Sequence, residues 1–141
     1  MIENPGFLPA YSGLTNLKFL AGIRRQITTD EIIRQIERVG LDPHSKKHVS
    51  KYSLGMPQRL AIAQALMENP KLLLLDEPMN GLDNAGVQEI RELLLKLKEE
   101  KKTIIITSHN PLDIITLCDT IHEMEKGKIT EVDVDHYRKM F

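Results

Sequence analysis

The first half of the chain spaces its apolar residues as amphipathic helices do. Apolar side chains recur every three or four positions over residues 14–25, which predicts a first helix there. Thr28 and Glu31 form a capping box before the next apolar stripe, and Gly40 supplies the left-handed residue that ends it. A third apolar stripe occupies residues 57–69, where one proline fits the first helical turn and another follows the last residue. The sequence therefore predicts three helices in this half.

The second half of the chain replaces this periodicity with continuous apolar runs. Residues 72–75 and 103–107 are short and uninterrupted, which is typical of parallel strands covered on both faces. The amphipathic stripe over residues 87–97 is long enough to be the crossover helix of a right-handed βαβ unit. Another helix is expected over residues 111–118, and the chain then turns back as a hairpin at residues 126–127. These elements predict an α/β fold.

The two patterns divide the chain into a helical part, about residues 1–69, and an α/β part, about residues 70–141. The chain carries 19 Lys and Arg against 20 Asp and Glu, so no basic field argues for a nucleic-acid partner. A single cysteine, Cys118, and an amino-terminal segment without signal-peptide character favour a reducing, cytoplasmic setting. The apolar runs fall far short of the ~18 residues of a membrane span, so direct membrane insertion is not expected.

Two carboxylates directly follow the first predicted strand. Asp76 and Glu77 are expected at the carboxyl end of that strand, where ligands of open α/β sheets bind. In a magnesium nucleotide site, Asp76 would hold Mg²⁺ and Glu77 would orient or deprotonate the water that attacks a γ-phosphate. A plain turn also explains these acids, because Pro78 and Gly81 follow closely. His109 follows the second strand at the same sheet edge, where an imidazole could donate to a phosphate oxygen or position the water.

A turn of small residues leads directly into the third predicted helix. Ser53 and Gly55 stand in this turn, just before the helix begins. Such a turn offers an anion free backbone amides, a hydroxyl and the positive end of a helix dipole. The same residues also suit an ordinary helix start, so this segment alone leaves both interpretations open.

Taken in order, these segments resemble the nucleotide-binding domain of ATP-binding cassette (ABC) transporters. By that resemblance, residues 52–66 match the signature motif, residues 72–78 the Walker B strand, residues 80–83 the D-loop and residues 107–109 the switch histidine. Residues 2–17 are similar to the Q-loop and the start of the helical subdomain. The likeness is nearest to bacterial exporters of the bacitracin and lantibiotic self-protection type.

Three segments depart from the family pattern. Glu3 stands where the family usually has glutamine, which keeps an oxygen ligand near the metal but adds a negative charge. Leu54 replaces one signature glycine, and residues 80–81 read Asn-Gly in place of the common Ser-Ala of the D-loop. Ser53 and Gly55, the positions expected to meet phosphate, keep the family pattern.

A phosphate-binding P-loop is missing from the sequence. That loop needs two glycines at a fixed spacing, followed by lysine and then serine or threonine, whereas the Gly127-Lys128 pair is followed by Ile129. The family places the P-loop and its strand before the Q-loop. The resemblance therefore implies an incomplete P-loop NTPase (RecA-like) parallel sheet core with a helical subdomain, lacking the Walker A strand and loop. We expect the isolated chain to be inactive, and to close its uncovered strands by self-association or a rearranged sheet.

The resemblance implies an ATP hydrolase in which two subunits sandwich two ATP molecules, with Mg²⁺ as cofactor. Glu77 and His109 would provide catalysis. Asp76 and Glu3 would bind the metal. Four residues would contact or serve the nucleotides. Ser53 and Gly55 would face the γ-phosphate that the partner subunit holds. Asp83 would link the two sites, and Glu3 would serve the nucleotide of its own subunit.

The partners implied are a transmembrane permease and a second ATP-binding subunit, which places the protein peripherally on the inner face of the cell membrane. In the family the helical part receives the permease, so four apolar residues are either core residues or a partner contact: Phe7, Leu14, Leu17 and Phe19. One alternative is a soluble ABC ATPase that acts on ribosomes. DNA-repair members are disfavoured, because they insert very long coiled coils between the Q-loop and the signature. Another alternative, a regulatory module without catalysis, predicts that changing Glu77 leaves transport intact.

Overall fold

A computed structural model of the chain describes residues 6–24 and 26–140 and forms two compact units, Met1–Thr107 and Ser108–Phe141. Glu3 lies outside the described residues. The predicted division into a helical part, residues 1–69, and an α/β part, residues 70–141, has other bounds than these units and stays a prediction. None of the helices in the described ranges has the length and apolar composition that crossing a membrane requires.

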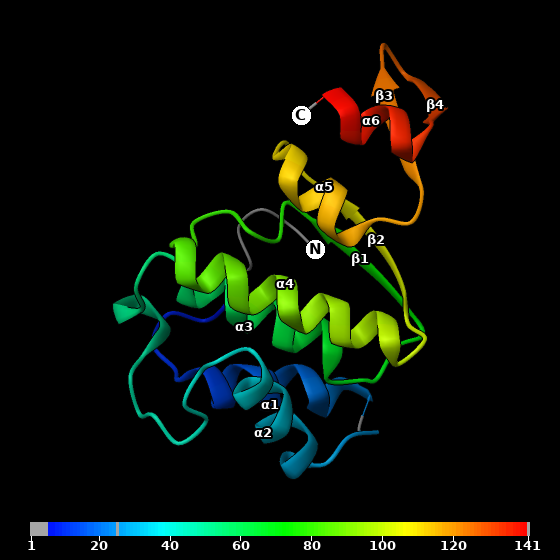
Figure 1. Cartoon of the computed structure of the whole chain (residues 1–141). Helices are drawn as coiled ribbons and strands as arrows, with labels where there is room; N and C mark the ends of the chain where they lie inside the picture. Colours follow the sequence, from blue (N-terminus) through cyan, green and yellow to red (C-terminus); the bar gives the residue numbers. More distant parts are fainter. Residues whose placement is uncertain (1–5, 25, 141) are drawn as a thin grey trace. The chain divides into compact units, whose positions relative to one another are not determined.

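Three helices form in the first unit where the apolar pattern predicts them. They are α1 (Gly13–Arg24), α2 (Thr29–Arg38) and α3 (Met56–Leu66), with a short 3-10 helix, η1 (Val49–Lys51), between the last two. Helix α2 contacts both α1 and α3 (Figure 1). Side chains that these helices bury almost completely include Leu17, Ile32, Ile36, Leu60 and Ile62. Their removal from water is the main source of stability for this group of helices.

The predicted capping box at the start of α2 is present. The Glu31 amide donates to Thr28 Oγ1 at 3.3 Å, and the Thr28 amide donates to Glu31 Oε2 at 2.7 Å. These hydrogen bonds satisfy two amides that the helix itself leaves without partners. The bond from the Thr28 amide, followed by the one from its hydroxyl, lowers the pKa of Glu31 below its usual value.

The two predicted strands pair in parallel. Strands β1 (Leu72–Asp76) and β2 (Thr103–Thr107) are aligned so that Asp76 lies opposite Thr107. Helix α4 (Asn84–Glu99) forms the crossover between them, as the sequence predicts. Because the carboxyl ends of parallel strands meet at one edge of a sheet, this register places the end of β2 beside the acids of β1.

Only one face of this sheet is covered. Leu73 and Leu75 are buried, whereas Leu72, Leu74 and Ile105 are 50%, 57% and 55% exposed. These exposures differ from the coverage on both faces that the apolar runs alone predict, and they agree with the expectation that the missing strand leaves these side chains uncovered. Successive side chains of a strand point to opposite faces of the sheet. The face that carries Leu73 and Leu75 is the covered one, as the alternating burial along β1 shows.

The exposed sheet face leads us to expect that the isolated chain self-associates. Sedimentation velocity should show species heavier than the 16.1 kDa monomer, because adjoining apolar side chains on a monomer surface favour association. The double variant Leu74→Lys/Ile105→Lys should shift the chain to monomer, whereas Ile23→Lys, which alters an exposed isoleucine on α1, should not. A wild-type chain that stays monomeric at tens of micromolar would contradict this expectation.

Arg59 joins α3 to two neighbouring helices. Its Nη1 atom donates to the Val39 carbonyl at the end of α2 (2.7 Å) and to Glu89 Oε2 on α4 (2.6 Å). A Cβ on Gly40 would lie 2.6 Å from Arg59 Nη1, and one on Gly86 would lie 2.8 Å from Nη2. Both glycines thus leave room for the guanidinium, which fixes the amino-terminal half of α3.

The second unit contains two short helices and a hairpin. Its elements are α5 (Pro111–Leu117), β3 (Ile121–Glu125), β4 (Lys128–Val132) and α6 (Val134–Met140). Lys126 and Gly127 both have positive φ values, 49° and 78°, as the predicted two-residue hairpin turn requires. Asn110 Oδ1 accepts a hydrogen bond from the Leu112 amide at 3.0 Å, which caps α5. Helix α6 is not predicted by the sequence pattern.

Candidate functional site

The two acids after β1 lie beside the end of β2. The Thr107 hydroxyl donates a short hydrogen bond to Asp76 Oδ1. The Glu77 amide donates to Thr107 Oγ1 at 3.1 Å and to the Thr107 carbonyl at 3.2 Å. One hydroxyl thus connects the Asp76 carboxylate to the Glu77 backbone. The structure brings the two acids together at the carboxyl end of the sheet, where such folds bind ligands.

The backbone of Glu77 is held in an unusual conformation. Its φ angle is +45°, in the left-handed region that costs a residue with a side chain about 1–2 kcal/mol. The Glu77 carbonyl accepts hydrogen bonds from Gln58 Nε2 (3.2 Å) and from the Asn80 amide (3.1 Å). Strained residues of this kind persist where their surroundings determine the backbone, and they concentrate at functional sites.

The turn before α3 borders a hollow of about 520 Å³, which residues 53–56, residues 81–83 and Arg59 line. The two segments approach closely, since a Cβ added to Gly55 would lie 2.9 Å from Leu82 Cδ2 and 3.0 Å from the Gly81 carbonyl oxygen. The structure therefore packs the two segments that depart from the family pattern, at Leu54 and at residues 80–81, against each other.

The beginning of α3 suits an anion. Gly55 is its N-cap residue, a proline stands in its first turn, and that turn contains no acidic side chain. The backbone amides and the helix dipole therefore present positive charge beside the exposed Ser53. Asp83 lies across the hollow, where its Oδ1 atom accepts a hydrogen bond from the Gly86 amide at 2.9 Å and caps α4. The expected role of Asp83 between two subunits stays a prediction.

Tyr52 ties the same turn to the start of α1. The Gly13 amide donates to the Tyr52 hydroxyl oxygen at 3.1 Å. Burial raises the pKa of Tyr52, since it disfavours the phenolate, and the phenol therefore stays neutral at physiological pH. The residue before Ser53 is thus anchored to the helical subdomain.

His109 lies in the second unit, on the loop between β2 and α5. Ser108 Oγ accepts a hydrogen bond from the Asn110 amide (3.1 Å) and donates to Asp113 Oδ2 (2.9 Å). Asp113 is 1% exposed, so a buried carboxylate holds the loop that carries the exposed His109. The placement of His109 beside Asp76 and Glu77 stays a prediction.

The acids fit a magnesium ion that is shared with a nucleotide. Within residues 6–24 and 26–140, no three His, Cys, Asp or Glu side chains converge as a metal-binding cluster. Proteins commonly hold Mg²⁺ at nucleotides through only one or two carboxylates, with phosphates and waters as the other ligands. Asp76, an exposed carboxylate at the strand end, meets that requirement. The other expected ligand, Glu3, lies outside the described residues.

Comparison with known proteins identifies close relatives. The family model described as "ABC transporter" matches residues 2–80. The chain is 47% identical to the uncharacterized ABC transporter ATP-binding protein YybJ of Bacillus subtilis (strain 168), over 99% of this chain and 64% of that protein. It is 45% identical to the bacitracin transport ATP-binding protein BcrA of Enterococcus faecalis, over 93% of this chain and 43% of that protein. The chain thus spans less than two thirds of the length of either relative.

A solved structure shares the fold. The ATP-binding cassette MJ0796, described as a dimer bound to ADP and Pi, superposes with a TM-score of 0.80 at 22% identity. The match covers 92% of this chain and 60% of that cassette. The α/β cassette architecture that the sequence predicts is therefore confirmed.

Proposed function

Because the chain belongs to the ABC transporter family, we propose that it is part of an ATP-binding subunit that drives export of a small molecule or peptide antibiotic through a membrane permease. The observation that carries the proposal is the hydrogen-bonded junction of Asp76, Glu77 and Thr107 at the carboxyl end of the sheet. The bacitracin transport relative supports export of an antibiotic.

ATP hydrolysis is the reaction proposed for this junction. Asp76 would hold Mg²⁺, and the bound ion would neutralise charge on the nucleotide phosphates. Glu77 orients or deprotonates the water that attacks the γ-phosphate, and ADP leaves. His109 acts on the same phosphate from the loop that Ser108 and Asp113 hold. Glu3 serves the same nucleotide as a further oxygen ligand.

A second ATP-binding subunit completes each site in this proposal. Ser53, Gly55 and the first turn of α3 face the γ-phosphate that the partner subunit holds, and Asp83 links the two sites. The positive end of α3 supports this role, because helix N-termini favour phosphate groups. Closure of the two subunits excludes water, and hydrolysis reopens them and moves the permease.

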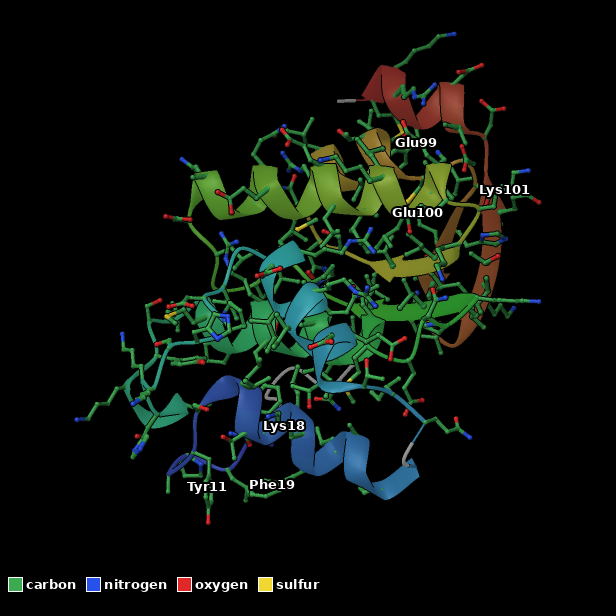
Figure 2. All side chains as sticks on the ribbon, turned by 90° about the horizontal axis from the view of Figure 1, so that it is seen from below. Tyr11, Lys18, Phe19, Glu99, Glu100 and Lys101 are labelled. Carbon is green, nitrogen blue, oxygen red and sulfur yellow. The ribbon has the colours of Figure 1, made fainter. Side chains whose placement is uncertain are left out.

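The permease contact is proposed for the outer side of α1. Phe19 is half exposed, and its ring packs edge-on against that of Tyr11 with 5.2 Å between ring centroids. Figure 2 shows both rings on the outer side of this helix. Leu17, by contrast, is fully buried in the core. Exposed aromatic side chains are the usual anchors of protein interfaces.

Purification of the complete tagged protein from solubilised membranes tests this function. A membrane permease should copurify with it, and Tyr11→Asp/Phe19→Asp should lower the recovery at least about tenfold, because two aromatic anchors are lost. Met124→Asp, which alters an exposed apolar residue on β3, serves as the control and should leave recovery unchanged. Recovery with ribosomes in place of a permease would favour the ribosomal alternative.

A further inference from the structure

We propose that Gln58 is a positioning residue, whose buried amide on α3 holds the Glu77 peptide in its left-handed conformation and so sets the direction of the Glu77 carboxylate. This inference rests on the proposed role of Glu77 in ATP hydrolysis. It concerns how one helix of the same subunit controls that residue.

Hydrogen bonds from two side chains hold the backbone of Glu77. Gln58 Nε2 donates to its carbonyl at 3.2 Å from α3, and Thr107 Oγ1 accepts from its amide at 3.1 Å from β2. Gln58 is only 7% exposed, although glutamine is usually a surface residue. A buried amide without a partner is costly, so the Gln58 side chain and the Glu77 carbonyl hold each other in place.

These hydrogen bonds explain why a glutamate is stable at a φ angle of +45°. Residues with side chains avoid this region unless their surroundings impose it. A net hydrogen bond shifts a conformational equilibrium by roughly five- to tenfold, so loss of the Gln58 amide allows Glu77 to relax toward ordinary backbone angles. The carboxylate then points away from the attacking water in a larger share of the molecules.

The location of Gln58 connects the beginning of α3 with the Glu77 backbone. Gln58 lies within the first turns of α3, the helix whose beginning carries Gly55 and follows Ser53. In the proposed function, that beginning meets the nucleotide of the partner subunit, whereas Glu77 serves the nucleotide of its own subunit. A displacement of α3 is therefore passed through one side chain to the catalytic carboxylate.

The test is a double-mutant cycle in the complete protein, with single-turnover ATP hydrolysis as the readout. Gln58→Met keeps the length of the side chain and removes the donor, so the hydrolysis rate should fall about tenfold while the KM for ATP changes less than twofold. In a Glu77→Gln background, the same change should cause little further loss, because Gln58 acts through the Glu77 carboxylate. Gln64→Met, on the same helix, is the matched control and should retain the wild-type rate.

The outcomes separate this inference from the proposed function. Multiplicative losses in the double variant, or an unchanged rate in Gln58→Met alone, would overturn the positioning role while Glu77 stays catalytic. An unchanged rate in Glu77→Gln would instead remove the proposed role of Glu77. If Gln58→Met fails to fold, Gln58→Asn gives the answer, because it keeps an amide donor on a side chain too short to reach the Glu77 carbonyl. Its hydrolysis rate should fall as well, and a wild-type rate in Gln58→Asn would overturn the proposal.

Discussion

Replacing Glu77 with glutamine in the complete protein is expected to lower ATP turnover by about 10²–10⁴-fold, the usual contribution of a general base. The change keeps the size of the side chain and its backbone hydrogen bonds to Thr107 and Gln58. It removes only the charge and basicity that activate the attacking water. ATP binding should persist, because the change removes a negative charge that repels the nearby γ-phosphate.

Steady-state phosphate release, measured beside equilibrium ATP binding, separates these two effects. Glu123→Gln is the matched control, since it makes the same chemical change at an exposed position on β3. Turnover at the wild-type rate in Glu77→Gln would remove the catalytic role of Glu77 and favour a regulatory module. Equal losses in both variants would point to a general effect on the fold.

The elements that the sequence predicted are those whose cause is local. The capping box of Thr28 and Glu31 starts α2, Asn110 caps α5, and residues 126–127 turn the hairpin. Each of these signals acts over a few residues, so it can be read without the rest of the chain. Helix α6 was missed because it is seven residues long and buries none of them.

The exposure of the sheet depends on packing partners and could not be read from β1 itself. A run of leucines is equally apolar whether one face or two are covered, so the run itself does not show that Leu72 and Leu74 are exposed. The sign in the sequence was the missing P-loop strand.

The candidate site was predictable only in part. Two acids at the end of a buried strand indicate a ligand site by their position alone, and the parallel register then brings Thr107 to them. Gln58 was missed, because it contacts a backbone carbonyl that every residue possesses. The contact depends on how α3 packs against the turn at Glu77, which the sequence does not show. A glutamine among apolar helix positions was the available signal.

The close approach of Gly55 to the D-loop leads to the second large effect. Gly55→Ala should lower ATP turnover of the complete protein about 10²-fold, the loss that follows when reacting groups are displaced by about 1 Å. The added Cβ would lie 2.9 Å from Leu82 Cδ2, a flexible atom, and 3.0 Å from the Gly81 carbonyl oxygen, which belongs to the backbone. Leu82 can turn aside, whereas the Gly81 carbonyl moves only with the whole segment, so the signature turn and residues 81–83 must separate.

Measurements of ATP binding and ATP-dependent dimerisation locate this defect. Binding by the single subunit should persist, while dimerisation weakens together with turnover, because Gly55 is proposed to face the partner's nucleotide. Gly22→Ala is the control, since its added Cβ has no atom within 4 Å apart from its chain neighbours and the backbone of its own helix, and alanine is favoured within a helix. Leu82→Ala in the Gly55→Ala background relieves only the softer contact, so recovery should be partial at most. Full recovery would mean that the Gly81 carbonyl yields easily, and wild-type turnover in Gly55→Ala would mean that the turn works without this close approach.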